Sequence, residues 1–340
     1  MRIIFLGTGA FGEPTLRWLA RSDYEVPLVV TQPARASGRG RRVVRTPIGA
    51  VAEELGLEVF DAENINDPES IQRLGSVGAH VGLAIAYGQK LSDSLLATTP
   101  AGYINLHASI LPKYRGAAPI NWAVARGERR SGCTVFRIVK RMDAGPVLVA
   151  HETDIAPQET AGELHDRLAA FGVAAVKEAL AMHDGGTVPQ GTAQDESVAT
   201  TAPKLKKSDG AIDFEKPAKA VAAHICGMTP WPGATTRFES QEGRWENVTI
   251  LRARVAGDPT SAATSTPSHA EPTAARDAAS LRNLPRTPGT VDARGFIAAA
   301  VGYVEVLEIK PSSGRVMNWS DYVNGRHVIA GDSFVDPKTA

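Results

Sequence analysis

The sequence predicts an α/β protein of two domains, with a mostly parallel sheet in the N-terminal part and a small β-barrel in the C-terminal part. Over residues 2–182, apolar runs of strand length alternate with stretches of helix length. That order is typical of a parallel sheet covered by helices on both faces. Beyond residue 245, short apolar runs separated by turn residues predict the strands of a barrel or sandwich. At 340 residues, the chain is long enough for two domains with separate cores.

The elements of the N-terminal part are predicted from apolar runs and helix-start signals. We expect strands over residues 2–6, 26–30, 80–86, 103–107 and 132–139. A proline stands at the start of three predicted helices, at Pro14, Pro47 and Pro68, where its missing N–H breaks no helical hydrogen bond. Thr160 and Glu163 have the spacing of a capping box, which predicts a longer helix that runs to about residue 182.

Changes in composition predict the domain boundaries. We expect an N-terminal domain over residues 1–189, a polar and turn-rich linker over 190–206, a barrel domain over 207–330 and a tail over 331–340. The barrel domain is predicted to hold a helix at 218–226 and strands at 248–255, 289–291, 295–301 and 304–309. Residues 257–288 are dominated by Ala, Ser, Thr and Pro. They cannot bury enough apolar surface to become ordered, so we expect a disordered insertion.

Composition restricts the classes of partner. The 37 basic residues balance the 37 acidic residues, so any affinity for nucleic acid must be local. The two cysteines, Cys133 and Cys226, lie far apart in sequence, which predicts neither disulfides nor a metal site and suits the cytoplasm. The N-terminal apolar run is too short for a signal peptide, and no apolar stretch approaches the roughly 18 residues of a spanning helix. We expect a cytoplasmic monomer that does not bind membranes.

Residues 7–12 read GTGAFG and match the G-x-G-x-x-G fingerprint of dinucleotide sites. Such a site also needs an acidic residue after the second strand to bind the ribose hydroxyl. Here that strand runs into Thr31, Gln32 and Pro33, with no acid. Arg35 keeps an NADP oxidoreductase open as an alternative, because its charge can bind a 2′-phosphate. The interpretation that we favour is a structural turn whose glycines allow close helix packing.

Three polar residues form the candidate catalytic set. Asn105 and His107 are two apart on a predicted strand, so both side chains leave the same face near its carboxyl end. Asp143 follows the strand at 132–139 on a turn. This set suits acyl transfer to an amine: Asn105 and a protonated His107 stabilise an oxyanion, and Asp143 takes the amine's proton directly or through water. The alternative is that His107 is only a hydrogen-bonded polar residue and Asp143 a turn former.

The stretch NLHASILPKYRGAAPI at residues 105–120 resembles the signature of the folate-dependent formyltransferases. Three further stretches resemble the branch of that family that acts on methionyl-tRNA: VTQPARASGRGRR, IAYGQKLSDSLL, and LKKSDGAIDF with TPWPGATT. The resemblance covers nearly the whole chain except residues 257–288. It implies transfer of a formyl group from 10-formyltetrahydrofolate to the α-amine of initiator methionyl-tRNA. The alternative within the family is an acceptor that is a nucleotide-linked amino sugar.

The resemblance also assigns site residues. It implies a Rossmann-like catalytic domain with an OB-like C-terminal barrel, and a folate co-substrate with neither NAD(P) nor metal. The family's catalytic positions match Asn105, His107 and Asp143, and its tetrahydrofolate-contacting tetrapeptide matches Ser109, Ile110, Leu111 and Pro112.

Two stretches depart from the family's usual pattern. Gly9 and Ala10 replace the proline and its neighbour that commonly follow the first Gly-Thr. Around Asp143, this chain reads MDAGPVL where many members have Leu-Asp-Thr-Gly-Asp. The second departure is shared with folate formyltransferases of other acceptors, so it leaves the identity of the acceptor open.

A basic loop is the candidate tRNA contact. Arg39, Arg41 and Arg42 lie between a strand and a helix, and in the family an equivalent loop engages the acceptor end of tRNA. A solvated loop is the alternative. Small barrels of the OB type often bind oligonucleotides. The sequence predicts a basic face on this one from Lys204, Lys206, Lys207, Arg252 and Arg254.

Overall fold

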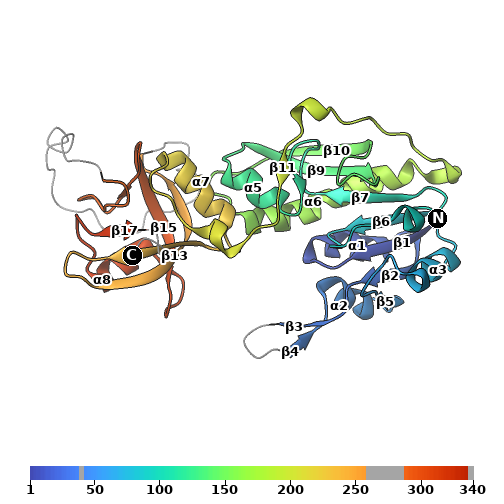
Figure 1. The fold of residues 1–340 in the computed structure, drawn as a ribbon, viewed down its shortest axis with the longest axis horizontal. Helices are drawn as coiled ribbons and strands as arrows, with labels where there is room; N and C mark the ends of the chain where they lie inside the picture. The colour runs from blue at the N-terminus through green and yellow to red at the C-terminus, as the bar shows by residue number, and fades with distance from the viewer. Residues whose placement is uncertain (38–41, 258–286, 336–340) are drawn as a thin grey trace. The chain divides into compact units, whose positions relative to one another are not determined.

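The computed structural model describes residues 1–37, 42–257 and 287–335. The chain forms two compact units (Figure 1). Unit 1 comprises Met1–Ile120, Arg130–Asp154 and Glu163–Lys204, and unit 2 comprises Asn121–Arg129, Ile155–Gly162 and the chain from Leu205 onward. The predicted insertion at 257–288 lies almost entirely outside the described residues, as do the last five residues of the predicted tail. The predicted domain boundaries and the linker at 190–206 stay predictions.

Unit 1 is built on a seven-stranded sheet in the order β10-β9-β7-β6-β1-β2-β5. Its strands are β1 (Arg2–Gly7), β2 (Glu25–Thr31), β5 (Val59–Asp61), β6 (Val81–Ile85), β7 (Tyr103–His107), β9 (Arg130–Arg137) and β10 (Val147–Asp154). The five strands from β7 to β5 are parallel, whereas β9 and β10 run antiparallel to their neighbours. The predicted mostly parallel α/β sheet is therefore confirmed, with β10 as a strand that the sequence analysis did not predict.

Helices cover both faces of this sheet. They are α1 (Glu13–Leu19), α2 (Pro47–Glu54), α3 (Pro68–Ser76), α4 (Asp93–Leu96) and α6 (Ala161–Ala181), with the 3-10 turns η1 (Ala10–Gly12), η2 (Asp184–Gly186) and η3 (Glu196–Val198) in the same unit. The helix α5 (Pro119–Ala125) begins in unit 1 and continues into unit 2 after Ile120. Ile4 and Leu6 of β1 are fully buried in a cluster with Leu74 of α3 and Leu95 of α4. Alternate residues of a strand point to opposite faces, so the intervening Phe5 lies on the other face, against α2.

The GTGAFG stretch forms the turn between β1 and α1. A Cβ on Gly7 would lie 2.8 Å from Cε1 of Phe5, and one on Gly12 would lie 3.2 Å from Cδ1 of Ile48 in α2. Contacts under 3.0 Å are not tolerated without movement, so Gly7 at least is required by the packing of this turn. Gly7 and Gly12 therefore have a structural role here, whereas a Cβ on Gly9 would make only ordinary contacts.

The predicted basic loop contains a short hairpin. Its strands β3 (Arg35–Ser37) and β4 (Arg42–Val44) form a two-stranded antiparallel sheet of their own, with Ser37 opposite Arg42. Val43 is 74% exposed and Val44 is 51% exposed. The sequence analysis treated this stretch as a loop, because three-residue strands are too short for a period-two pattern to be recognised.

The segment after α6 returns to the sheet instead of leaving unit 1. Its strand β11 (Thr201–Ala202) pairs in parallel with β8 (Arg115–Gly116), which belongs to the loop after β7. Residues 190–206 were predicted as a linker because they are polar and turn-rich. In the structure the part of this stretch up to Lys204 belongs to unit 1.

Unit 2 contains an antiparallel, nearly closed barrel, which confirms the predicted OB-like fold. Its strands are β12 (Ala234–Glu239), β13 (Trp245–Val255), β14 (Ile297–Ala298), β15 (Tyr303–Pro311), β16 (Met317–Asn318) and β17 (Ser333–Val335); its helices are α7 (Ala218–Met228), α8 (Trp319–Arg326) and the 3-10 turn η4 (Lys207–Gly210). The strand order is β14-β15-β13-β12-β17, with β16 beside β15. Isolated bridges from Thr290 to Ser333 and from Val291 to Ile297 join the two ends of this order. None of the described helices has the length and apolarity to cross a membrane.

Candidate active site

The strand β7 carries two of the three predicted catalytic residues at its carboxyl end. Asn105 pairs with Ala84 of β6 on one side and with Phe136 of β9 on the other, and His107 lies opposite Thr134 of β9. A parallel neighbour on one side and an antiparallel neighbour on the other fix the backbone of this strand. Both side chains therefore project from one face of a fully hydrogen-bonded strand.

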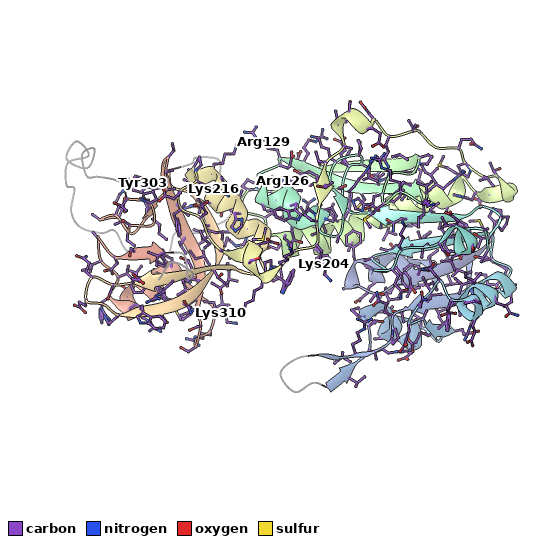
Figure 2. The ribbon with its side chains drawn as sticks, in the orientation of Figure 1. Arg126, Arg129, Lys204, Lys216, Tyr303 and Lys310 are labelled. Carbon is purple, nitrogen blue, oxygen red and sulfur yellow. The ribbon has the colours of Figure 1, made fainter. Side chains whose placement is uncertain are left out.

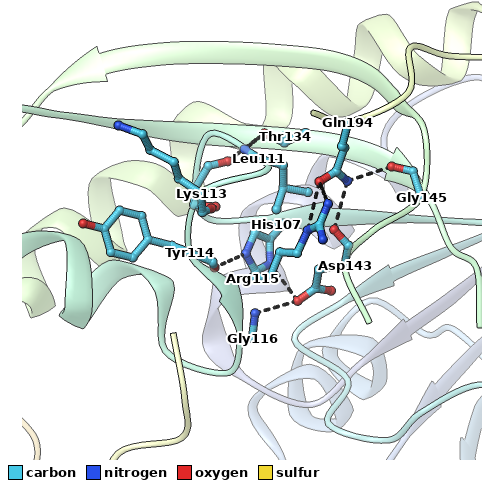
Figure 3. A network of polar contacts seen from close by, with 11 residues as sticks. His107, Leu111, Lys113, Tyr114, Arg115, Gly116, Thr134, Asp143, Gly145 and Gln194 are labelled. Carbon is cyan, nitrogen blue, oxygen red and sulfur yellow. Dashed lines mark hydrogen bonds and ion pairs between the residues drawn. The ribbon is translucent and has the colours of Figure 1, made fainter. Parts of the chain in front are cut away.

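The ring of His107 is held by one nitrogen and presents the other to Asp143. The residue is 7% exposed, and its Nε2 lies 2.9 Å from the carbonyl oxygen of Tyr114. Because a carbonyl oxygen only accepts hydrogen bonds, Nε2 carries the proton of the neutral imidazole. Nδ1 lies 3.9 Å from Oδ2 of Asp143. The structure thus makes Nδ1 the nitrogen available for chemistry (Figure 3).

Asp143 stands on the turn before β10 with its carboxylate fixed by a backbone donor. Its Oδ2 accepts a hydrogen bond of 2.8 Å from the amide of Gly116, and its side chain is 18% exposed. The residue has φ of 49°, the left-handed region that non-glycine residues seldom adopt. The structure therefore brings Asp143 and His107 together, as the sequence analysis predicted.

Asn105 differs from its two partners in having unused hydrogen-bonding capacity. It is half-buried, and within the described parts of the chain no hydrogen bond joins its side-chain amide to another residue. An amide that is partly shielded from water and not bonded to protein is available to donate to a bound substrate.

The predicted folate-contacting tetrapeptide follows β7 as a tightly bonded loop. Thr134 of β9 holds it, because its Oγ1 donates to the carbonyl of Ser109 at 2.7 Å and accepts from the amide of Leu111 at 3.2 Å. Oγ of Ser109 donates to the carbonyl of Lys113 at 2.7 Å. The apolar side chains of this loop are thus presented from a fixed backbone next to His107.

A layer of polar residues that the sequence analysis missed surrounds this set. Arg115, Gln194 and Glu196 are joined to one another and to the loop of Asp143 by hydrogen bonds. Arg115 lies in the stretch at residues 105–120 that resembles the family signature, and the other two lie in the stretch predicted as a linker. The sequence carried no signal for them, because a polar, turn-rich composition does not reveal tertiary contacts.

The predicted nucleic-acid contacts are only partly described. Arg39 and Arg41 lie outside the described residues, and of Arg42 only the backbone, at the start of β4, is described. In unit 2, Nε of Arg252 lies 3.7 Å from Glu308 and that of Arg254 lies 2.6 Å from Glu305. The contribution of Arg252 and Arg254 to a basic face stays a prediction, and both residues pair with carboxylates of β15.

Metal ligands do not gather anywhere in the described ranges. Within residues 1–37, 42–257 and 287–335, no group of three or more His, Cys, Asp or Glu side chains has the geometry to hold a metal ion.

Comparisons with known families place the chain. The formyl transferase family matches residues 1–180, and the formyl transferase C-terminal domain matches residues 204–327. The chain therefore belongs to the formyl transferase family. Gln194 and Glu196 lie between the two matched ranges.

Two relatives that match nearly the full length of this chain are both methionyl-tRNA formyltransferases. A methionyl-tRNA formyltransferase of Solibacter usitatus is 38% identical over 330 residues, 96% of each chain. A methionyl-tRNA formyltransferase of Heliobacterium modesticaldum is 36% identical over 338 residues, 98% of this chain and 100% of the relative. Among solved structures, WlaRD, a sugar 3N-formyl transferase crystallised in the presence of dTDP and 5-N-formyl-THF, has a TM-score of 0.59 at 14% identity. The match covers 93% of this chain and 99% of WlaRD, and it shows a shared fold.

Proposed function

We propose that this protein transfers a formyl group from 10-formyltetrahydrofolate to the α-amine of methionyl-tRNA, with initiator tRNA as the acceptor in translation initiation. The observation that carries the proposal is the pairing of His107 and Asp143, 3.9 Å apart beside Asn105, in a family member. The names of full-length relatives at 36–38% identity support methionyl-tRNA as the acceptor over an amino sugar. We also propose a monomer that acts in the cytoplasm.

The reaction must move one proton when the formyl group passes from N10 of the folate to the nitrogen of the amine. The amine loses a hydrogen when it forms the new N–C bond, and N10 of the folate gains one when its bond to the formyl carbon breaks. Asp143 is the group that we assign to carry this proton, directly or through water, because it is the carboxylate that faces the free nitrogen of His107. The amide of Gly116 occupies one of its oxygens and leaves the other for exchange.

Asn105 and His107 stabilise the negative charge that develops on the formyl oxygen during attack. The side-chain amide of Asn105 is a donor without a described protein partner. His107 donates from Nδ1 when the ring is protonated, since Nε2 is already bonded to the carbonyl of Tyr114. Donors fixed in a partly buried site stabilise such charge more strongly than water does, because they need no reorganisation.

The loop Ser109–Pro112 has the properties that a pterin ring requires. A flat heterocycle needs apolar walls and a rigid backbone for its edge hydrogen bonds. Leu111 is 7% exposed and its amide is fixed by Thr134. Ser109, Ile110, Leu111 and Pro112 are therefore the residues that we propose to contact the folate.

The tRNA contacts are proposed on charge. Arg39 and Arg41 lie in sequence between β3 and β4, and Arg42 is the first residue of β4. Guanidinium groups pair strongly with phosphates, so we propose these three residues as contacts of the acceptor end. In unit 2 the exposed basic side chains labelled in Figure 2 include Arg126, Arg129, Lys216 and Lys310, and Lys204 ends unit 1. These groups offer additional positive charge for a large polyanion.

The test is formyl transfer from 10-formyltetrahydrofolate to purified methionyl-tRNA, with the Asp143→Asn variant alongside. The wild-type protein should formylate the tRNA, and Asp143→Asn should be slower by about 10²- to 10⁴-fold, the usual contribution of a general acid or base. Asp321→Asn, an exposed aspartate of unit 2, should match the wild type. Formylation of a nucleotide-linked amino sugar, with none of methionyl-tRNA, would refute the proposal.

A further inference from the structure

The segment Thr192–Ala202 lies across the two loops that carry the site. At one end, Thr192 and Val147 exchange backbone hydrogen bonds of 2.7 and 2.8 Å just after the turn of Asp143. At the other end, the Oγ1 of Thr200 accepts from the amide of Tyr114 at 2.9 Å, and its own amide donates to the carbonyl of Pro112 at 3.2 Å. The segment therefore connects the loop after β7 to the loop before β10.

Gln194 bridges these two loops with its side chain. Its Nε2 donates to the carbonyl of Asp143 at 2.9 Å and to that of Gly145 at 2.7 Å. Its Oε1 accepts from Nε and Nη2 of Arg115 at 3.1 and 2.7 Å. A glutamine amide offers two donors and two acceptor sites, and all four are used. The orientation of the amide is thus fixed by its partners, as Figure 3 shows.

Arg115 is itself held in place, so Gln194 is bonded to a fixed group. Arg115 is 8% exposed, and a buried guanidinium needs a counter-charge. Glu196 supplies it through two hydrogen bonds of 2.9 Å, and the hydrogen bond from Arg115 lowers the pKa of the Glu196 carboxyl. Glu196 also pairs with Arg141 at 2.9 Å. Arg115, the donor to Oε1 of Gln194, is therefore anchored.

Two contacts hold Asp143, one at its main chain and one at its carboxylate. Gln194 holds its main-chain carbonyl, and Gly116, the residue after Arg115, donates to its Oδ2 at 2.8 Å. Asp143 keeps φ of 49°, and a left-handed conformation persists only where the surroundings determine it. Without Gln194, the peptide is free to leave that conformation and take the carboxylate with it.

We propose that Gln194 is a positioning residue for the reaction: it holds the turn of Asp143 so that the carboxylate faces Nδ1 of His107. The inference rests on the proposed function and extends it to a residue that acts through Asp143. Misplacing a reacting group by about 1 Å costs up to about 10²-fold in rate, so an effect of this kind is measurable.

The first test is Gln194→Glu, which keeps an acceptor for Arg115 but cannot donate to the carbonyls of Asp143 and Gly145. We expect kcat to fall on the order of 10- to 100-fold, with unchanged KM for both substrates. Gln190→Ala is the matched control, since Gln190 is an exposed glutamine two residues before this segment and has no described side-chain hydrogen bond. If thermal melting shows that Gln194→Glu is unstable, Gln194→Ala replaces it, because alanine adds no charge beside the carbonyls.

The second test separates positioning from a general structural role. In an Asp143→Asn background, the Gln194 substitution should add little further loss of single-turnover rate, because both changes then act on the same carboxylate. Losses that multiply, or a wild-type kcat for the Gln194 variants, would overturn the inference. A wild-type protein that leaves methionyl-tRNA unmodified would instead refute the proposed function, so the two failures are distinguishable.

Discussion

The site of unit 1 and the β3–β4 hairpin of the same unit differ in the number of distant chain segments that hold each of them in place. Asp143 is fixed by Gly116 and Gln194, residues 27 and 51 positions away in sequence. The hairpin is a sheet of two strands, and no third strand in the described parts of the chain pairs with it. Among its described neighbours, Arg45 just after β4 pairs with Glu53 and Asp61 and so anchors the base of the hairpin.

The difference matches what each region is proposed to do. Bond formation requires reacting groups held within about half an ångström, which long-range hydrogen bonds from several segments can provide. Pairing with phosphates depends on the number of cations more than on their exact positions, because much of the free energy comes from counterion release. A hairpin that stands outside the main sheet suffices for the second task and would fail at the first.

Substitutions at β7 should change activity more than those at the hairpin, and the loss should be in kcat. We expect Asn105→Ala and His107→Ala each to lower kcat by about 10²- to 10³-fold, as loss of one oxyanion donor does, with little change in folate affinity. Single-turnover rates and folate titrations measure the two quantities. Asn324→Ala, an exposed asparagine of unit 2, is the control. Normal single-turnover rates in both variants would remove these residues from the mechanism.

Substitution of the basic loop should act on binding and leave chemistry unchanged. Replacing Arg39, Arg41 and Arg42 with alanine should weaken binding of methionyl-tRNA and reduce its salt dependence by somewhat less than about one log–log unit per lost phosphate contact. Titrations at several salt concentrations measure this slope, and Arg21→Ala, at an exposed arginine of the same unit, controls for net charge. Equal affinity and parallel slopes would show that the loop does not contact tRNA.

The smallest effect should come from the apolar residues of the hairpin. Val43 is 74% exposed, so Val43→Thr should change the free energy of unfolding by less than about 0.5 kcal/mol. Val135 of β9, beside the site, is 0% exposed, and Val135→Thr should cost roughly 1–3 kcal/mol because it buries a hydroxyl. Chemical denaturation measures both. Equal losses would contradict the contrast between the two regions.

The sequence predicted the parts of the site that depend on local rules. Asn105 and His107 are two residues apart on a strand, so their shared face followed from the alternation of side chains. Asp143 was recognised as a turn residue after an apolar strand. Its approach to His107 was a hypothesis that the structure confirms, with the two side chains 3.9 Å apart.

The parts that were missed depend on contacts between distant segments. Gln194 and Glu196 lie in a polar stretch whose composition resembles any linker, and only the tertiary structure shows what they bind. The same holds for Arg252 and Arg254, because the carboxylates that pair with them come from β15, another strand of the barrel. Residues 289–291 were predicted as a strand. In the structure, Thr290 and Val291 instead make isolated bridges that join the ends of the barrel, and these also depend on distant partners.

The return of β11 to β8 sets a minimum length for a catalytic fragment. A fragment cut after residue 189, at the end of the predicted N-terminal domain, keeps Asn105, His107 and Asp143 but loses Gln194 and β11. One that ends after Lys204 keeps the pairing of Thr201 with Arg115. During synthesis on the ribosome, the same constraint means that the site is completed only after residue 202 has left the exit tunnel. The site therefore cannot assemble until about the first three-fifths of the chain have emerged from the ribosome.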